Sequence, residues 1–345
     1  MKTFPPEWAK QDAILMAYPH KDTDWAYMLD EVQLCFSEII NTITGFNQTV
    51  ILLVPDEECS RFAADKFGKK VFPLIMPIND TWARDFGAIF VKDGNTHVCH
   101  DYKFNGWGLK FAADKDNLIT GAMTCKNIFS EEVSYMNRLN FVLEGGSLES
   151  DGEGTLLTTA ECLLSPNRNG QWDRIQIEEY LKSAFGLNRV LWLNNGSLAG
   201  DDTDSHIDTL ARFCNPQTIA YIKCDDTKDI HFESLSYMED ELKSFRAHDG
   251  KPYKLVPLPM PEPVYFDGER LPATYANFLI INNAVLVPTY SSPRDKEAIE
   301  TLSAVFPERE VVGINCNALI KQHGSLHCVT MQFPEGTINP KILSR

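Results

Sequence analysis

The sequence predicts an α/β protein built from repeated modules of similar length. Short apolar runs rich in β-branched residues, typical of strands, alternate with segments that have helical spacing. Tight-turn signals recur at positions 94, 152, 216 and 282, so that the steps between them are 58, 64 and 66 residues. One strand-like run near each end of the chain has no partner within these repeats. A regular step of this length is long enough for one supersecondary unit per repeat.

Each repeat begins with a predicted β-hairpin. The turns are Asp93-Gly94-Asn95, Asp151-Gly152-Glu153, Asn215-Pro216 and Asn282-Asn283. Glycine and asparagine are favoured in tight hairpin turns because they tolerate positive φ, and proline marks a turn by fixing φ. A helix and a further strand follow each of the last three hairpins, with the helices expected over residues 172–185, 232–245 and 294–306. The module therefore has a ββαβ order.

The unpaired runs at residues 13–18 and 329–333 suggest how the molecule is completed. Pairing them would form a fifth hairpin and close a ring without open edges. We therefore predict a pseudo-fivefold α/β-propeller closed by the N- and C-terminal strands. It would form a single domain over residues 1–336, followed by a C-terminal tail over 337–345. An ordinary α/β sandwich with coincidental turn spacing is the alternative.

The composition of the chain limits the classes of binding partner that it can have. The chain has 345 residues, 43% of them hydrophobic, and a formal net charge of −16. Such a charge repels phosphate backbones and anionic lipid, so we expect neither nucleic acid nor membrane as a partner, whereas a small cation is compatible with it. The chain has nine cysteines without a CxxC pair, and it shows no recognisable leader or membrane span. These features predict reduced thiols in the cytoplasm. The sequence leaves a homo-oligomer open.

The polar residues that could carry chemistry fall at equivalent places in the modules. Asp85 lies 9 residues before Gly94, and Glu144 lies 8 residues before Gly152. His206 and Asp208 precede the third turn by 10 and 8 residues, and Cys328 begins the strand that would close the ring. If the modules surround one axis, all of these side chains point at one centre, which is the geometric requirement for an active site.

The residue types suit a planar cation. Paired carboxylates can grip a guanidinium group, and Trp82 could offer its ring face to a positive charge. In an extended chain, His206 and Asp208 would face the same side. Taken singly, Asp85 could form a structural salt bridge, and Glu144 could belong to a plain loop.

Four aspartates lie between residues 201 and 208, including Asp202 and Asp204. Such groups repel one another unless a cation sits among them. A metal is one candidate, because these carboxylates with His206, His323 and His327 could hold zinc or manganese. No HExxH motif or regular ligand spacing supports it. We therefore favour Cys328 as a nucleophile stabilised by an imidazolium or by a bound cation, and expect no metal or cofactor.

Four motifs in this order resemble those of the agmatine deiminases, which belong to the guanidine-modifying superfamily of pentein (α/β-propeller) fold together with bacterial peptidylarginine deiminases. The motifs are Asn79-Asp80-Thr81-Trp82-Ala83-Arg84-Asp85, Glu144-Gly145-Gly146, Asp202-Thr203-Asp204-Ser205-His206-Ile207-Asp208 and His323-Gly324-Ser325-Leu326-His327-Cys328. The resemblance spans nearly the whole chain and departs from the family at Ser205, where glycine is more common.

The resemblance implies a role for each matching residue. Cys328 would be the nucleophile, His206 the general acid and base, and Asp85 and Asp208 the carboxylates that grip the guanidinium. Trp82 and Glu144 would line the substrate pocket. Asp202 and Asp204 are the acids that we expect to receive a distal amine.

The reaction so implied is hydrolysis of agmatine to N-carbamoylputrescine and ammonia through a thiouronium adduct on Cys328, a step towards putrescine. It needs no cofactor. The alternatives are a deiminase of peptidyl arginine or another guanidine, a metal-dependent hydrolase, and a ring that binds without catalysis.

Overall fold

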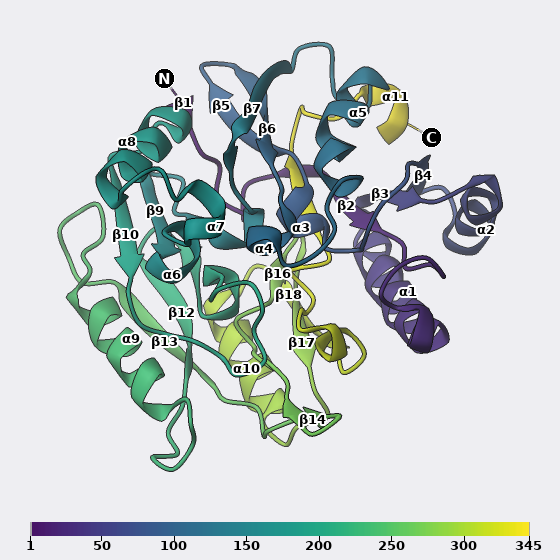
Figure 1. Ribbon diagram of the computed structural model, residues 1–345. Helices are drawn as coiled ribbons and strands as arrows, with labels where there is room; N and C mark the ends of the chain where they lie inside the picture. Colours follow the sequence, from purple (N-terminus) through teal and green to yellow (C-terminus); the bar gives the residue numbers. More distant parts are fainter. Residues whose placement is uncertain (1, 345) are drawn as a thin grey trace.

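The computed structural model describes residues 2–344, in which five small sheets are arranged around a common centre. In Figure 1 the chain passes these sheets in turn, from the blue strands at the top, through the teal and green strands on the left, to the yellow-green strands below. The purple and dark-blue strands from the start of the chain lie on the right.

The first complete module shows the pattern that the others repeat. Strand β5 (Ile89–Asp93) pairs antiparallel with β6 (Thr96–Lys103), and β6 runs parallel to β7 (Ser134–Val142). The short strand β1 (Lys2–Thr3) adds to the edge beside β5. The three modules that follow consist of β8 (Glu149–Ser150), β9 (Thr155–Thr159) and β10 (Arg189–Leu193); β11 (Ala211–Asn215), β12 (Thr218–Lys223) and β13 (Lys254–Pro259); and β16 (Leu279–Ile280), β17 (Ala284–Thr289) and β18 (Glu310–Asn315). Each again has an antiparallel pair followed by a parallel strand. All four predicted hairpins are confirmed.

The two ends of the chain share the fifth sheet. Strand β19 (Met331–Pro334) runs antiparallel to β2 (Gln11–Ala17), with Met331 opposite Leu15. Strands β3 (Thr49–Val54) and β4 (Val71–Ile75) continue this sheet in parallel. The predicted pairing of the terminal strands is therefore confirmed.

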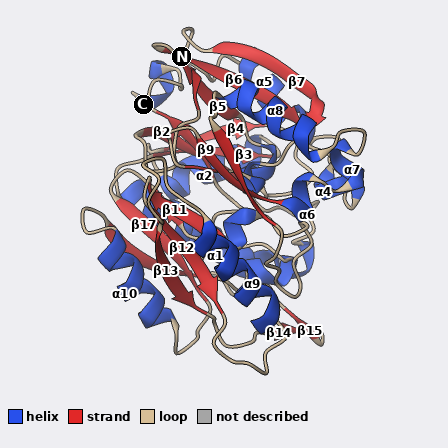
Figure 2. Ribbon diagram, turned by 90° about the vertical axis from the view of Figure 1, so that its left-hand side faces the viewer, coloured by secondary structure: helices blue, strands red, loops and turns tan. Residues whose placement is uncertain are grey.

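The longer helices lie outside the sheets, as Figures 1 and 2 show. They are α1 (Leu29–Gly45), α2 (Glu57–Phe67), α5 (Ile119–Cys125), α8 (Arg174–Phe185), α9 (Phe232–Ser244) and α10 (Asp295–Val305). Helix α1 buries Phe36, Ile39, Ile40 and Ile43, the spacing of an amphipathic helix that packs one face on a core. All the helices of the described chain fall short of the length and hydrophobicity that a bilayer crossing demands.

Shorter elements complete the chain between these helices and strands. They are α3 (Ala83–Phe86), α4 (Gly106–Leu109), α6 (Ala160–Leu163), α7 (Pro166–Asn169), α11 (Pro340–Leu343), the hairpin β14 (Tyr265–Phe266) and β15 (Glu269–Arg270), and the 3-10 turns η1 (Ala26–Met28), η2 (Asp116–Leu118), η3 (Gly145–Ser147), η4 (Ile207–Thr209) and η5 (Leu319–Gln322). The segment expected to be a tail includes buried Ile338, which bridges to Phe129, and buried Ile342 on α11. Packing therefore continues past residue 336.

Candidate active site

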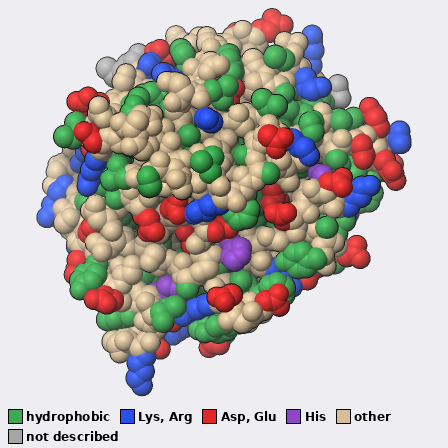
Figure 3. All heavy atoms as spheres, in the orientation of Figure 1, with side chains coloured by type: hydrophobic (Ala, Val, Ile, Leu, Met, Phe, Trp, Pro, Cys, Tyr) green, Lys and Arg blue, Asp and Glu red, His purple; other side chains and the backbone are tan. Residues whose placement is uncertain are grey.

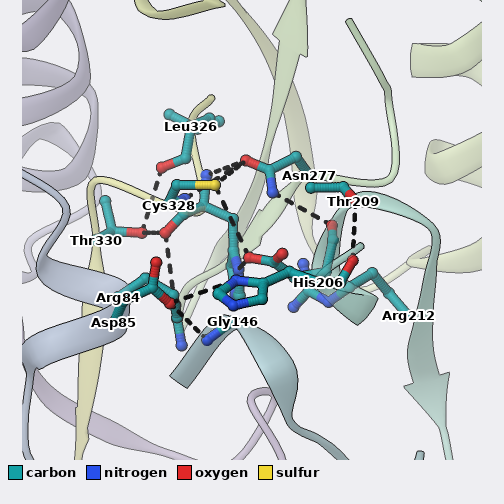
Figure 4. A network of polar contacts seen from close by, with 12 residues as sticks. Arg84, Asp85, Gly146, His206, Thr209, Arg212, Asn277, Leu326, Cys328 and Thr330 are labelled. Atoms are coloured by element: carbon teal, nitrogen blue, oxygen red, sulfur yellow. Dashed lines mark hydrogen bonds and ion pairs between the residues drawn. The ribbon is translucent and has the colours of Figure 1, made fainter. Parts of the chain in front are cut away.

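Residues from four modules meet near the centre of the ring of sheets, and Figure 4 shows how they converge. The thiol Sγ of Cys328 lies 3.9 Å from Oδ2 of Asp208, and Nδ1 of His206 lies 3.6 Å from Oδ1 of Asp85. The backbone N–H of Arg84 donates to the carbonyl of Cys328 at 3.1 Å, which ties α3 to the loop that carries the thiol. The structure thus brings together the four residues expected to be catalytic.

Asp85 lies in the single turn of α3 and is buried. Its Oδ2 accepts a hydrogen bond of 2.9 Å from Nε1 of Trp107, and its Oδ1 accepts one of 2.9 Å from the backbone N–H of Gly146. Burial, together with the nearby carboxylates of Asp208 and Glu144, raises the pKa of Asp85 despite the opposing charge of His206. A bound cation would therefore stabilise the charged form of this carboxyl group.

Gly146 allows the site to be this compact. A Cβ atom at this position would lie 2.5 Å from Nδ1 of His206 and 2.9 Å from Oδ1 of Asp85. No side chain fits there without displacing catalytic atoms, so glycine is required by close approach and not by its φ angle.

His206 lies between two buried carboxylates. Its Nε2 is 3.6 Å from Oε2 of Glu144, on the side opposite Asp85. Burial alone would lower the pKa of His206, but the charges of Asp85 and then Cys162, together with the adjacent carboxylate of Glu144, raise it well above its usual value. Glu144 is itself held by Arg168, whose Nε donates to Oε2 at 2.7 Å. The histidine is therefore poised as an imidazolium that can give up a proton.

The chain from His206 to Asp208 is not extended, contrary to expectation. His206 leads into η4, and the carbonyl of His206 accepts a hydrogen bond of 2.8 Å from Oγ1 of Thr209. This local hydrogen bond competes with an extended conformation. Ser205 has φ of 61°, the left-handed region in which glycine is favoured.

Asp208 and Asn277 hold the thiol from two sides. Sγ of Cys328 lies 3.4 Å from Oδ1 of Asn277, and Oδ2 of Asp208 accepts a hydrogen bond of 2.7 Å from Nδ1 of His327. Burial, followed by the negative charges of Asp208 and Asp85, raises the pKa of Cys328 well above its usual value. These surroundings therefore favour the neutral thiol of Cys328 over its thiolate.

Three buried polar atoms of this cluster make no hydrogen bond among the described residues. They are Nε2 of His206, which faces Glu144 at 3.6 Å, Nη2 of Arg84, which faces Glu7 at 3.7 Å, and Oδ1 of Asp208. Buried polar groups are nearly always satisfied in folded proteins, so each unsatisfied one requires an explanation. A ligand that donates hydrogen bonds to Asp208 would satisfy its carboxylate.

A pocket leads from the surface to the thiol. Its walls include Trp82, Asp85 and Trp107, and Cys328 lies among them. The backbone of Gly324 packs against the ring of Trp82 so closely that a Cβ atom would overlap it. Wider hollows lie elsewhere on the described surface, but they do not reach Cys328. Figure 3 shows acidic, basic and histidine side chains gathered across the middle of the face seen in Figure 1.

Asp202 and Asp204, which we expect to receive the terminal amine of the substrate, have different surroundings. Asp202 lines the pocket, and burial with the charge of Asp201 raises its pKa to about 6. Asp204 instead forms ion pairs with Lys110 and Arg168, and the pocket walls do not include it. Two further acids, Asp24 and Asp80, do line the pocket. The crowding of aspartates is thus relieved in part by cations of the chain itself.

The histidines considered as zinc ligands have other partners. Nδ1 of His323 lies 2.7 Å from the carbonyl of Gly200, and both ring nitrogens of His327 contact carboxylates. A different trio, Glu144, Cys162 and His206, lies within 4.8 Å. Arg168 places its guanidinium against Glu144, a position that competes with a metal ion for the same oxygens. The ligand set predicted for a metal is not assembled.

Three residues of the site were not predicted as catalytic or binding residues. Asn277 is the one polar residue within the apolar stretch 276–281, a signal that could have identified it. Trp107 lies in a glycine-rich segment, and α4 holds both Trp107 and Gly108 at positive φ. Arg168 follows Pro166 on α7 and carries no motif of its own.

Comparison with known proteins agrees with this geometry. The family model of the Porphyromonas-type peptidyl-arginine deiminases matches residues 3–334. A curated relative from Legionella pneumophila (strain Paris), provisionally named an agmatine deiminase, is 32% identical over 96% of this chain and 95% of its own length.

Two solved structures are still more similar. One, from Porphyromonas gingivalis and provisionally named an arginine deiminase, has a TM-score of 0.93 and 52% identity, covering 98% of this chain and 100% of its own. The other is a cysteine-to-serine variant of C. jejuni agmatine deiminase with substrate bound. It has a TM-score of 0.91 and 38% identity, and the match covers 97% of each chain. The chain belongs to the agmatine deiminase and Porphyromonas-type peptidyl-arginine deiminase family of the pentein superfamily.

Proposed function

We propose that this chain hydrolyses agmatine to N-carbamoylputrescine and ammonia through a covalent adduct on Cys328. The observation that supports this most directly is the unsatisfied Oδ1 of Asp208, whose other carboxylate oxygen lies 3.9 Å from Sγ of Cys328. Oδ1 is an acceptor suited to a guanidinium N–H, and the ring of His206 is suited to exchange a proton with the same group.

Substrate capture relies on two carboxylates. The guanidinium group would enter between Asp85 and Asp208, with its N–H groups donating to their oxygens. Asp85 is already oriented by Trp107 and Gly146, so little rearrangement is needed. Placing a cation here offsets the repulsion between the two carboxylates and keeps the guanidinium charged and planar.

Substrate binding would also activate the nucleophile. The pKa of Cys328 is raised by burial and by Asp208 and Asp85. A guanidinium that neutralises these carboxylates favours the thiolate, so the thiol loses its proton to solvent when substrate enters. The thiolate then attacks the guanidinium carbon, and a C–S bond forms.

His206 moves the protons of the two half-reactions. As an imidazolium it protonates the leaving nitrogen, the C–N bond breaks, and ammonia departs from a thiouronium adduct. Neutral His206 then takes a proton from water, and the hydroxide adds to the same carbon. Cleavage of the C–S bond releases the ureido product and the thiolate. Glu144 steadies the imidazolium throughout, since it lies 3.6 Å from Nε2.

The outer part of the pocket favours a substrate with a second positive charge. Asp24, Asp80 and Asp202 line it, and no lysine or arginine is among its lining residues. Burial and the charge of Asp24 raise the pKa of Asp80 to about 7. A primary amine at the end of a four-carbon chain would be attracted here, whereas the carboxylate of free arginine would be repelled. We propose Asp202, with Asp80, as the groups that receive this amine, and Asp204 as a residue that acts through Lys110 and Arg168.

The wider setting follows from the same proposal. The product would supply a later step towards putrescine, and the free cysteines are consistent with a reaction in the reducing cytoplasm. We infer that the five sheets, completed by the pairing of β2 with β19, act as a closed propeller that holds residues of different modules at one centre.

The decisive experiment separates the substrates. Purified protein is incubated with agmatine, free arginine or an arginine-containing peptide, and ammonia release is measured with Cys328→Ala as the blank. We expect agmatine to give the highest kcat/KM by a wide margin. A preference for the peptide, the activity named by the family model, or for free arginine would overturn the substrate assignment.

A second measurement tests the mechanism. Mass spectrometry of protein quenched during turnover should find one amidino adduct, on the peptide that contains Cys328. An unmodified Cys328, or activity that is lost on treatment with a chelator, would favour a metal-dependent hydrolysis instead.

A further inference from the structure

Beneath Asp208 lies a second cluster of buried charges to which the N-terminal segment contributes Glu7. Oε2 of Glu7 accepts hydrogen bonds of 2.6 Å from Nε2 of His327 and 2.8 Å from Nη2 of Arg212. Its Oε1 accepts one of 2.7 Å from the backbone N–H of Ile280. Both oxygens of Glu7 are therefore fixed by groups from other modules.

His327 connects this cluster to the active site. Its Nδ1 lies 2.7 Å from Oδ2 of Asp208, and its Nε2 lies 2.6 Å from Oε2 of Glu7. An imidazole ring can donate from both nitrogens only when it is doubly protonated and positively charged. Both partners are carboxylates, which accept and do not donate when ionised. The pKa values of Asp208 and Glu7 are both lowered despite their burial, by the charges and hydrogen bonds of His327 and Arg212.

The same histidine is rigidly attached to the nucleophile. Its backbone N–H donates to Oδ1 of Asn277 at 2.9 Å, and that oxygen also lies 3.4 Å from Sγ of Cys328. His327 thus fixes the side chain of Asp208 while its backbone shares a partner with the thiol. The distance between the nucleophile and the carboxylate that receives the substrate depends on this one residue.

We propose that His327, kept positively charged by Glu7, is a positioning residue that turns Asp208 so that its Oδ1 faces the substrate. This inference rests on the proposed capture of a guanidinium by Asp208. His327 itself does not touch the substrate, since its two ring nitrogens are occupied by carboxylates.

Loss of one proton from His327 would undo the arrangement. A neutral ring that still donates to Glu7 would turn the lone pair of Nδ1 towards Oδ2 of Asp208, and two acceptors at this distance repel each other. Asp208 would then rotate or take up a proton, and in either case it would bind a cation less well. The charged or titratable groups that face His327 are Asp208, Glu7, Arg212, Glu149, Cys328 and Arg84, whose Nε lies 3.4 Å from the carbonyl of His327.

The substitution Glu7→Gln tests the charge without removing the side chain. The amide oxygen can still accept from Arg212 or Ile280, but the negative charge that holds the second proton on His327 is lost. We expect KM for agmatine to rise on the order of tenfold, as for loss of a hydrogen bond to a charged group. We also expect kcat to change little, because the reacting atoms are not altered. An unchanged KM in a folded Glu7→Gln protein overturns the proposal.

The matched control is Glu149→Gln. Glu149 forms an ion pair with Nε of the same Arg212, but no hydrogen bond joins it to His327. This variant should lose thermal stability to a similar degree and retain the wild-type KM for agmatine. An equal rise in KM in both variants would show that the effect is structural and would contradict a specific role for Glu7.

A direct observation of His327 separates this inference from the proposed function. Ring ¹⁵N chemical shifts of the wild-type protein at pH 8, assigned with His327→Gln, should show both nitrogens protonated. In Glu7→Gln one of them should lose its proton in the same range. A singly protonated ring in the wild type overturns the inference, whatever the substrate proves to be. Failure to turn over agmatine, with a doubly protonated ring, would instead count against the proposed function alone.

Discussion

Two buried clusters of charge lie next to each other at the centre of this molecule, and they differ in what they leave unpaired. Around Arg212, all three guanidinium nitrogens are bonded: Nε to Glu149, Nη1 to the carbonyl of Phe278 at 2.6 Å, and Nη2 to Glu7. Around Cys328, Nε2 of His206 and Oδ1 of Asp208 make no hydrogen bond within the described part of the chain, and between the two clusters the same holds for Nη2 of Arg84, 3.7 Å from Oε2 of Glu7.

This difference indicates how a site is distinguished from a structural core. Both clusters are buried, both join several modules, and both shift the pKa values of their carboxyl groups. Burial and charge alone therefore do not mark function. Hydrogen-bonding capacity that is left over, beside a nucleophile and at the end of a pocket, does so more reliably.

Removal of the nucleophile should cause the largest loss of activity. Cys328→Ala should lower kcat for agmatine by about 10⁴-fold or more, as removal of a covalent catalyst does in other hydrolases. The melting temperature should change little, because the thiol makes few bonds. Steady-state kinetics and calorimetry check both values. Cys125→Ser, which alters an exposed thiol, is the control and should keep wild-type activity.

Substitution in the Arg212 cluster should lower the free energy of unfolding. Replacing Arg212 by Met leaves Glu7 and Glu149 buried without their cation, and breaking a buried ion pair in this way costs about 3–5 kcal/mol. Urea unfolding measures the loss. The control is Lys243→Met, which alters an exposed ion pair on α9 and should change stability little. Equal losses in the two variants would refute the structural role of this cluster.

The acids at the mouth of the pocket predict the direction of the pH dependence. The pKa values of Asp202 and Asp80 are raised to about 6 and about 7, so both carboxyl groups are protonated at low pH and ionise as the pH rises. The value of kcat/KM for agmatine should therefore climb between pH 5 and pH 8, by up to about tenfold per unit below the lower pKa.

Two comparisons sharpen this pH prediction. Asp202→Asn should flatten the part of the limb near pH 6, since the neutral amide cannot pair with an amine. An alkylguanidine without the terminal amine should show a much weaker limb with the wild-type enzyme. A limb of the same size for both substrates would mean that Asp202 and Asp80 do not bind the amine.

The smallest effect is expected at the surface. Lys110, whose side chain is 36% exposed, bonds the carbonyl of Asp202 and the carboxylate of Asp204. Lys110→Ala should lower stability by about 1 kcal/mol or less, as is usual for exposed ion pairs. It should raise KM severalfold with little change in kcat, because the segment that carries Trp107 loses an anchor. A large fall in kcat would place Lys110 in the chemistry.

The repeating architecture could be predicted because the hairpin turns depend on local sequence. Gly94 and Gly152 both adopt positive φ, as glycine in a tight turn does. The predicted pairing of the terminal strands followed from counting unpaired runs. The convergence of Asp85, His206, Asp208 and Cys328 followed from their equivalent places in the modules.

What could not be predicted depends on contacts between modules. Nothing near Glu7 in the sequence indicates that it bonds His327, 320 residues away. The direction of Asp204 was likewise not predictable, because its backbone adopts φ of 66° and its partners, Lys110 and Arg168, come from other loops. The side-chain hydrogen bond from Thr209 replaced the extended conformation expected at His206. Sequence spacing identifies which residues occupy a module. It does not specify which side chains point towards the neighbouring module.

The contact between Glu7 and His327 has a consequence for biosynthesis. Glu7 and His327 are 320 residues apart, so the carboxylate of Glu7 is synthesised long before the imidazole that it binds. Closure of so long a loop is entropically slow, and contacts of this kind form late in folding. A nascent chain stalled before codon 327 would carry most of its sheets and yet be catalytically silent.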